Sequence, residues 1–173
     1  MSLRCLVLSV VLAGSLAHTA GCGTAPAATG GPTIVAKDGE IPLPEPNLAG
    51  NVSLEEAIAG RRSVREFSEK LLTWQEVSQL LWAAQGITEP RGLRAAPFAG
   101  ALYPLEVYVV LPAGVYHYLP QGHAVSAVLD GDRRGGLWEA GLRQDALRQA
   151  AAIFVITGVY ERTEGKYGER AER

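Results

Sequence analysis

Apolar and polar residues alternate with helical spacing in two segments near the middle of the chain. Ser53-Leu-Glu-Glu56 and Thr73-Trp-Gln-Glu76 are capping boxes, in which a hydroxyl and a carboxylate three residues apart satisfy backbone amides at a helix start. Gly60 ends the first segment and Gly86 the second. In the second, the apolar residues fall on one helix face: Val77, Leu80, Leu81 and Ala84. We therefore predict a short helix over 54–59 and an amphipathic helix from 74 to the residue before Gly86.

From residue 105 onward the apolar pattern becomes that of β-strands. Residues 105–111 are rich in β-branched and aromatic side chains, Pro112-Ala-Gly114 forms a turn, and 115–119 and 124–129 follow in hairpin order. A helix is predicted over 137–150. The continuous apolar run 152–160 is typical of a strand buried on both faces. Strands of mixed direction covered by helices predict an α+β sandwich.

The first fifty residues have the composition of a targeting segment and a linker. Arg4 followed by a short apolar run predicts a secretion signal, and Gly21-Cys22 after small residues resembles a bacterial lipobox, so 1–21 is predicted to be a lipoprotein signal peptide. Cys22 would be the lipidated residue, although Thr19 stands where a leucine-like residue is usual. The alternative is an ordinary cleavable signal with a chance cysteine. Both interpretations place the mature protein outside the cytoplasm.

Domain boundaries follow from this composition. Residues 22–50 are rich in Gly, Ala, Thr and Pro, which favours an extended tether without a core, and 51–173 would form one folded domain. A lipoprotein would be anchored to the membrane, on its extracytoplasmic side, through its lipid.

Charge and cysteine content exclude several classes of function. The 173 residues carry 16 Lys and Arg against 18 Asp and Glu, a net charge of -2, which gives no general attraction to nucleic acid. Both cysteines precede the predicted domain, so they form no disulfide framework within it. The three histidines lack metal-site spacing. We expect no nucleic-acid partner and no metal.

The densest group of positive charge is Arg61, Arg62 and Arg65, with Ser63 between them. Guanidinium groups pair bidentately with phosphate oxygens, and a neighbouring hydroxyl can complete the shell. The alternative is a solvated surface, or a helix-end charge effect, as an arginine pair after a helix often is.

A loop of small residues lies between two prolines, Pro97 and Pro104, directly before the strand from Leu105. Small side chains let the backbone approach a flat ligand closely. A tight loop leading into a core strand is the equally simple alternative.

Taken together, these motifs resemble the opening half of the nitroreductase family. Arg61-Arg-Ser-Val-Arg-Glu-Phe67 is followed by the 97–104 loop and then by Glu106-Val-Tyr-Val-Val110. The detail is similar to the SagB-type dehydrogenase branch, whose members carry a Pro-Ser-Ala-Gly-Ala-x-Tyr-Pro loop. Residues 114–118 and 160–171 also resemble that branch, so the resemblance covers roughly 53–171.

The resemblance implies a nitroreductase-like α/β/α sandwich around a mixed, largely antiparallel sheet, with FMN bound between the subunits of a homodimer. It places Arg61, Arg62, Ser63 and Arg65 around the phosphate and ribityl chain, and Pro97, Ala99, Gly100 and Ala101 beside the flavin ring. Lys166 and Tyr167 match a pair that handles the proton in azoline-oxidising members. A surface lysine beside a packing tyrosine is the alternative for that pair.

The sequence also departs from the family pattern. Phe98 replaces the usual serine, Gly165 stands where a leucine commonly precedes the Lys-Tyr pair, and Glu172 replaces an aromatic residue. The family continues well beyond residue 173, so the domain would be incomplete at its C-terminus. The strand over 152–160 would then lack neighbours and covering helices.

We therefore expect an exported FMN-dependent oxidoreductase that moves a hydride between flavin and a small organic or peptide-derived substrate, with a nicotinamide as candidate electron donor. The central expectation is that the arginine cluster and the proline-bracketed loop converge on one mononucleotide. The rival hypothesis is a lipid-anchored binding module that retains part of the scaffold without catalysis. A third is an interrupted reading frame whose product does not fold stably.

Overall fold

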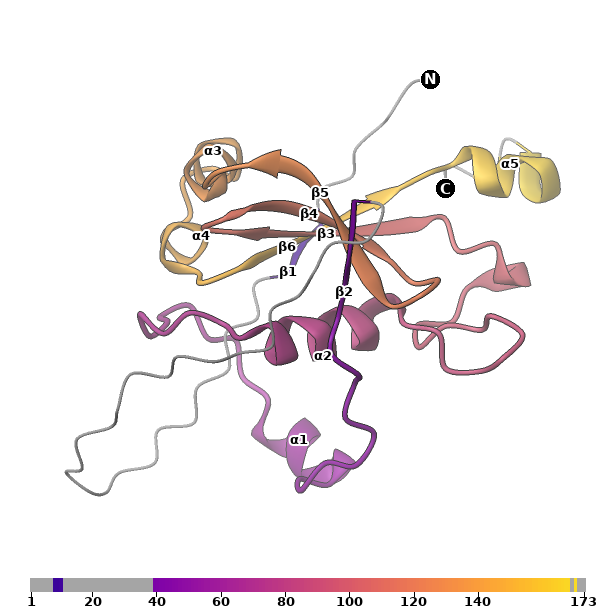
Figure 1. The fold of residues 1–173 in the computed structure, drawn as a ribbon, viewed down its shortest axis with the longest axis horizontal. Helices are drawn as coiled ribbons and strands as arrows, with labels where there is room; N and C mark the ends of the chain where they lie inside the picture. Colours follow the sequence, from indigo (N-terminus) through magenta and orange to yellow (C-terminus); the bar gives the residue numbers. More distant parts are fainter. Residues whose placement is uncertain (1–7, 11–38, 169, 171–173) are drawn as a thin grey trace.

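A six-stranded sheet organises the chain, with helices packed on both of its faces (Figure 1). This computed structural model describes residues 8–10, 39–168 and 170. The strand order is β1-β6-β3-β4-β5-β2, and every pair is antiparallel. In chain order the elements are β1 (Leu8–Val10), β2 (Glu40–Pro42), α1 (Leu54–Gly60), α2 (Trp74–Gln85), the 3-10 turn η1 (Ala99–Ala101), β3 (Leu105–Leu111), β4 (Gly114–Leu119), β5 (Ala124–Asp130), α3 (Arg134–Ala140), α4 (Asp145–Gln149), β6 (Ile153–Gly158) and α5 (Glu161–Tyr167).

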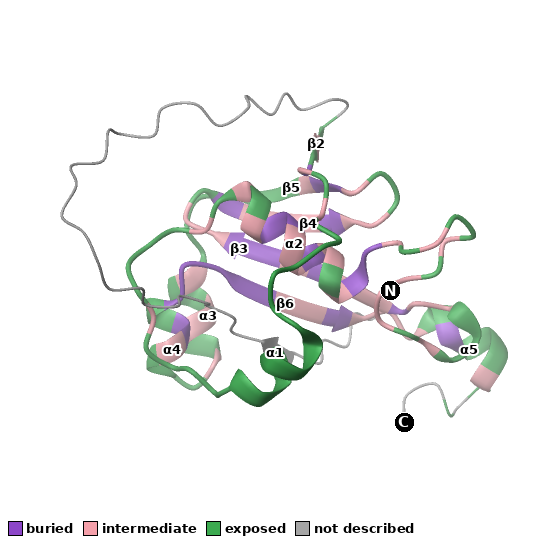
Figure 2. Ribbon diagram, turned by 90° about the horizontal axis from the view of Figure 1, so that it is seen from below, coloured by how far each residue is buried: buried purple, intermediate pink, exposed green. Residues whose placement is uncertain are grey.

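The main core lies between α2 and one face of the sheet. Val77 and Leu81 on the apolar stripe of α2 are fully buried there. Figure 2 shows α2 lying across this face of the sheet, with buried segments in purple along the helix. They pack in one cluster with sheet residues of the same face: Val107, Val109, Tyr118, Val125 and Phe154. Successive strand residues face opposite sides, so Val107 and Val109 point to α2 while Tyr108 and Val110 do not. Both capping boxes are present, which confirms the predicted starts of α1 and α2.

A second, smaller cluster covers part of the opposite face. Val110 and Ile153 of the sheet pack there with Leu147 of α4 and Ala150, and Trp138 of α3 lies against them. Figure 1 shows α3 and α4 together at one end of the sheet and α5 at the other. The α+β fold class is confirmed. The sheet is antiparallel throughout the described part, where the sequence analysis expects strands of mixed direction.

The predicted helix over 137–150 is wrong as a single element. It is divided into α3 and α4 by Gly141, and the two residues after it, Leu142 and Arg143, have φ values of 60° and 56°. This turn lets Leu147 of α4 pack directly against Gly141, where a Cβ atom would collide with the leucine side chain. Apolar spacing alone does not reveal such a break, because both halves face the same core.

Residues 40–47, which the sequence analysis assigns to the tether, take part in the fold. Glu40–Pro42 pairs with Ala124–Ser126 of β5, and Leu43 is 8% exposed within the main core. The backbone N–H of Leu43 donates to the carbonyl of His123 at 3.0 Å. Residues 40–47 therefore form a strap that runs across the edge of the sheet and the first half of α2.

The apolar strand β6 has neighbours on both sides. It pairs with β3 over its whole length, and Leu8–Val10 pairs with Phe154–Ile156 on its other edge. The expectation that this strand lacks neighbours is therefore wrong when residues 8–10 are present. Leu8–Val10 falls within the predicted signal peptide, so removal of the first 21 residues would take this edge strand away. Cys22 lies outside the described residues.

Candidate functional site

Lys166 lies directly over Gly100, which brings α5 against the loop that precedes β3. A Cβ atom on Gly100 would lie 3.2 and 3.3 Å from Cδ and Cε of Lys166 and would overlap its Nζ. Gly100 has φ of 73° and ψ of 11°, a left-handed conformation that glycine adopts at little cost. The structure thus joins two segments that the sequence analysis singles out separately.

The Lys-Tyr pair occupies the last turn of α5. Lys166 is exposed and Tyr167 is half-buried, and Nζ of the lysine lies 5.8 Å from the centroid of the tyrosine ring. The ammonium group thus lies near the face of the phenol ring. Beside them the loop presents small, mostly exposed residues at Pro97, Ala99 and Ala101, while the ring of Phe98 is half-buried.

An ionic network lies at the base of the same loop. Glu106 at the start of β3 forms an ion pair with Arg162 of α5, and Nε2 of His117 lies 2.5 Å from its other carboxylate oxygen. Arg162 also donates to the backbone carbonyl of Tyr103 at 2.9 Å. The imidazole of His117 stacks on Tyr108, with 4.7 Å between ring centroids. The network ties β3, β4 and α5 together behind the loop.

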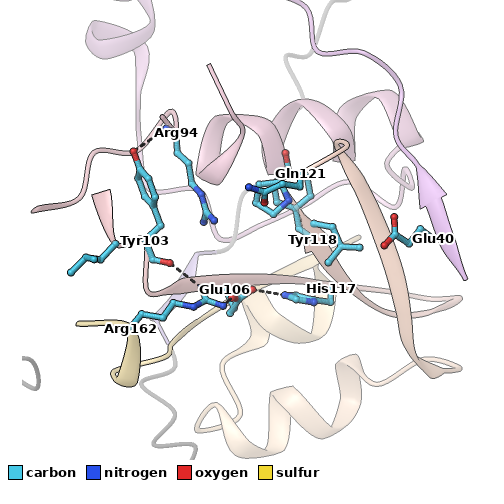
Figure 3. A pocket seen from close by; sticks show the side chains of 11 residues that line it. Glu40, Arg94, Tyr103, Glu106, His117, Tyr118, Gln121 and Arg162 are labelled. Carbon is cyan, nitrogen blue, oxygen red and sulfur yellow. Dashed lines mark hydrogen bonds and ion pairs between the residues drawn. The ribbon is translucent and has the colours of Figure 1, made fainter. Parts of the chain in front are cut away.

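Arg94 reaches into a pocket beside this network (Figure 3). Its guanidinium lies 4.7 Å from the ring centroid of Tyr103 and donates to the side-chain oxygen of buried Gln85 at 3.1 Å, while its backbone N–H donates to the Tyr103 hydroxyl at 3.2 Å. Burial lowers the pKa of Arg94, although nearby Glu106 acts in the opposite direction. The pocket has a volume of about 390 Å³.

Sequence reasoning missed these pocket residues. The signal was a glutamate and a histidine placed inside otherwise apolar strands, Glu106 in β3 and His117 in β4. The observed register pairs Tyr108 with His117, which sets His117 diagonally from Glu106 on the same sheet face. Register between two strands and the position of Arg162 on a later helix are not encoded in local spacing.

The arginine cluster lies elsewhere in the chain. Arg61, Arg62, Ser63 and Arg65 are exposed, and the guanidinium of Arg62 donates to the carbonyls of Ala59 and Arg61 at 2.9 and 2.8 Å. Figure 1 shows α1, which leads into the cluster, on the far side of α2 from α5. The expected convergence of cluster and loop is therefore not found within one chain.

The described residues add two further observations. Within 8–10, 39–168 and 170, no helix has the length and apolar character needed to cross a bilayer. In the same part of the chain, no group of three or more His, Cys, Asp or Glu side chains is placed to hold a metal ion.

Comparison with known proteins decides the family. The nitroreductase family model matches residues 58–173, two thirds of the chain, including the arginine cluster, the loop and α5. The chain belongs to the nitroreductase family. Its members are, in general, FMN-dependent oxidoreductases that act on small molecules with nicotinamide donors and often form dimers.

Several nitroreductase relatives support this assignment. A protein assigned to the nitroreductases, MJ1384 of Methanocaldococcus jannaschii, is 39% identical over 140 residues, which cover 78% of this chain and 69% of MJ1384. TfxC, a trifolitoxin operon protein of Rhizobium leguminosarum bv. trifolii, is 27% identical over 72% of this chain and 40% of its own length. A nitroreductase crystal structure from Ralstonia eutropha JMP134 superposes with a TM-score of 0.67 at 30% identity, over 78% of this chain and 63% of that one. The chain thus spans roughly two thirds or less of these relatives.

The nitroreductase chain offers suitable groups for FMN, but in two separate places. The exposed guanidinium groups of the arginine cluster match the chemistry of a phosphate, and described carboxylates make no ion pair with Arg61, Arg62 or Arg65. The loop beside Lys166 presents small, exposed residues at Ala99 and Ala101, which suit the approach of a flat ring. Within one chain, the groups suited to a phosphate and the loop suited to a flat ring are therefore not brought together.

Proposed function

We propose that this nitroreductase is an FMN-dependent oxidoreductase that moves a hydride between flavin and a small organic or peptide-derived substrate. The observation that carries the proposal is the contact between Lys166 and Gly100. Through this contact the loop, which is predicted to lie beside a flavin ring, packs against Lys166, which is predicted to handle the proton. Bound FMN would supply the hydride chemistry, and the protein would supply orientation and electrostatics.

The proposed site is completed by a second copy of the chain. Large apolar side chains around α1 are exposed, among them Leu54 at 71%, Ile58 at 65% and Val64 at 52%. A segment with so much exposed apolar surface is suited to an interface. Because the arginine cluster directly follows α1, covering this segment with a partner would bring the cluster toward the partner's loop. In a symmetric dimer both sites would be built in the same way.

Each predicted residue then has a role in the proposed site. Arg61, Arg62, Ser63 and Arg65 of one copy hold the phosphate and ribityl chain. The loop of the other copy, Pro97, Ala99, Gly100 and Ala101, lies against the ring and excludes water from one face. Lys166 holds a proton at Nζ, next to the phenol of Tyr167, for delivery to or removal from the substrate.

The substrate class is proposed from the SagB-type resemblance. The Lys166-Tyr167 motif and the loop resemble members that oxidise azoline rings formed from peptides, and the similarity to a trifolitoxin operon protein supports that branch. Nitroaromatic compounds and quinones remain convenient acceptors for an assay, with a nicotinamide nucleotide as the donor.

The proposed location is the extracytoplasmic side of a bacterial membrane, with Cys22 carrying the lipid. The sequence of the first 22 residues supports this proposal. A Cys22→Ser variant expressed in bacteria should leave the membrane fraction and lose incorporation of labelled palmitate. Retention of both label and membrane association by that variant would contradict the proposal.

The function is tested by purifying the chain with FMN and recording its flavin absorbance and its nicotinamide-dependent reduction of a nitroaromatic or quinone. We expect a yellow protein that turns over. Lys166→Ala should keep the flavin and lose most turnover, whereas Lys70→Ala, which removes an exposed lysine paired with Glu76 on α2, should keep both. A folded but colourless and inactive protein would contradict the proposal and favour a non-catalytic binding module.

A further inference from the structure

The pocket beside Arg94 is lined by none of the residues proposed to hold FMN. It is formed by the ends of β3, β4 and α5 and by the chain around 102–103 and 119–121, as Figure 3 shows. Apolar groups on its wall come from Leu102, Leu119 and Pro120, and the rings of Tyr103 and Tyr118 complete it. With a volume of about 390 Å³ it can hold a small organic molecule.

The carboxylate of Glu106 in this pocket has partners of opposite charge, whereas the guanidinium of Arg94 has none within ion-pair distance among the described residues. Glu106 is already engaged by Arg162 and His117. Arg94, in contrast, makes no ion pair with a carboxylate in the part of the chain that the structure describes. Its guanidinium has five N–H groups, and the hydrogen bond to Gln85 uses one of them. A half-buried cation with unused donors thus points into the cavity.

The position of Arg94 is fixed before any ligand arrives. The ring of Tyr103 supports one face of the guanidinium, Gln85 holds one edge, and the backbone N–H of Arg94 is bonded to the Tyr103 hydroxyl. Such preorganisation lowers the entropy lost on binding. Partial burial removes some of the water that would stabilise the charge of Arg94. A bound anion would stabilise that charge in place of the lost water.

We propose that this pocket binds the carboxylate of a small molecule with an apolar body, with Arg94 as the anchoring group. Arg162 contributes a second guanidinium to the same wall. Because Arg162 and Lys166 are four residues apart on α5, they lie on the same helix face, so a bound carboxylate would hold its molecule next to Lys166. The inference rests on the proposed function in identifying this molecule as the substrate.

A singly charged carboxylate fits better than a phosphate. Glu106 and Glu40 both line the pocket and would repel a second negative charge. The planar guanidinium of Arg94 matches the two oxygens of one carboxylate. Leu102 and Leu119 then remain for the apolar body of the ligand.

The test uses benzoate as the probe on the purified 173-residue chain, with binding measured by calorimetry or by ligand-observed NMR. We expect benzoate to bind with millimolar or tighter affinity, and its neutral isostere benzamide to bind about tenfold more weakly. Arg94→Gln should weaken benzoate binding by about ten- to a hundredfold, and Arg94→Lys by less. Inorganic phosphate at equal concentration should not displace benzoate.

Arg91→Gln is the matched control. Arg91 lies three residues away, is 79% exposed at its side chain and pairs with Glu89 outside the pocket, so its loss should leave benzoate binding unchanged. Equal weakening by both variants, equal affinity for benzamide, displacement by phosphate, or no benzoate binding to folded wild-type chain would overturn the proposal.

FMN binding is titrated separately on the same samples. A chain that binds benzoate but not FMN would contradict the proposed function while leaving the pocket assignment intact.

Discussion

Gly100 and Lys166 are in contact because the glycine has no side chain: its backbone has left-handed φ and its missing Cβ leaves the space that the lysine fills. Two distant segments of sequence, the proline-bracketed loop and the last helix, thereby share one surface. The contact sets the lysine beside the small, exposed loop residues Ala99 and Ala101. It is the geometric basis of the proposed active site.

Replacing Gly100 with alanine should displace the lysine. We expect a loss of about 1 kcal/mol in the free energy of unfolding from the left-handed backbone, with a further loss of turnover because the new methyl group occupies the position of Nζ. Gly92→Ala is the control, since Gly92 has φ of 88° and nothing within 4 Å of its missing Cβ. Denaturant unfolding and steady-state kinetics measure both effects. Equal turnover in the two variants would show that the contact is not used.

The strap over 40–47 is held by a buried polar network centred on His123. The Tyr118 hydroxyl lies 2.9 Å from Nδ1 of His123, whose Nε2 lies 2.7 Å from Ser78 Oγ and 3.1 Å from the carbonyl of Pro44. Because that carbonyl can only accept, the arrangement fits a proton on Nε2 and a tyrosine that donates to Nδ1. The network fastens the strap to α2 and to the β4–β5 turn.

Tyr118→Phe should therefore destabilise the protein by about 1–3 kcal/mol, because it leaves a part-buried imidazole nitrogen without a donor. Tyr116→Phe is the matched control on the same strand. Its ring packs edge-on against Trp74 at 5.5 Å, and its half-buried hydroxyl makes no hydrogen bond among the described residues. Urea denaturation of both variants is the measurement. A smaller loss for Tyr118→Phe than for Tyr116→Phe would refute the role of the network.

Alkaline pH should weaken the fold through the same tyrosine. Burial raises the pKa of Tyr118 to about 12 from its ordinary value of 10.0. The pKa of Tyr118 is higher in the folded state than in the unfolded state. The protonated phenol therefore stabilises the fold fully below pH 10, and this contribution is lost as pH rises toward 12. Between pH 10 and 11 we expect wild type to lose about 1 kcal/mol more than Tyr118→Phe. Parallel stability curves for the two proteins would contradict this assignment.

The two capping boxes should differ in their contribution to global stability. Thr73→Ala removes the cap of α2, whose Val77 and Leu81 form part of the main core, and should cost about 1 kcal/mol. Ser53→Ala removes the equivalent cap of α1, which has no buried residue, and should cost less than about 0.5 kcal/mol in the isolated chain. Thermal and urea unfolding of both variants provide the comparison, and equal losses would mean that α1 is part of the cooperative unit.

Local sequence signals predict much of this fold. The capping boxes locate the starts of α1 and α2, and the β-branched run over 105–111 coincides with β3. A capping box is a pair of hydrogen bonds between residues three apart, and the alternation of side chains along a strand is likewise local. Both can therefore be recognised from the sequence. The strand β2 was missed because three residues around a proline carry little β signal. Its pairing depends on β5, more than eighty residues away.

The candidate site was predictable only in part, because its contacts also join residues that are distant in the sequence. The segments of the arginine cluster, the loop and the Lys-Tyr pair could be recognised from the family resemblance, but the contact of Gly100 with Lys166 arises from the packing of α5. Arg94, Glu106 and Arg162 come together from a loop, a strand and a helix, and no spacing in the sequence links them. The separation of the arginine cluster from the loop likewise depends on the position of α1 outside the main core.

Complementation between two inactive variants tests the central claim most directly. Arg61→Ala/Arg65→Ala removes two of the proposed phosphate ligands, and Gly100→Val blocks the loop, so each variant alone should be folded, dimeric and unable to bind FMN. Mixed after unfolding and refolding, they should recover about a quarter of the wild-type flavin sites, because half of the dimers are mixed and each of these has one intact site. A mixture that forms mixed dimers and remains free of flavin would contradict a site built from the arginine cluster of one chain and the loop of the other.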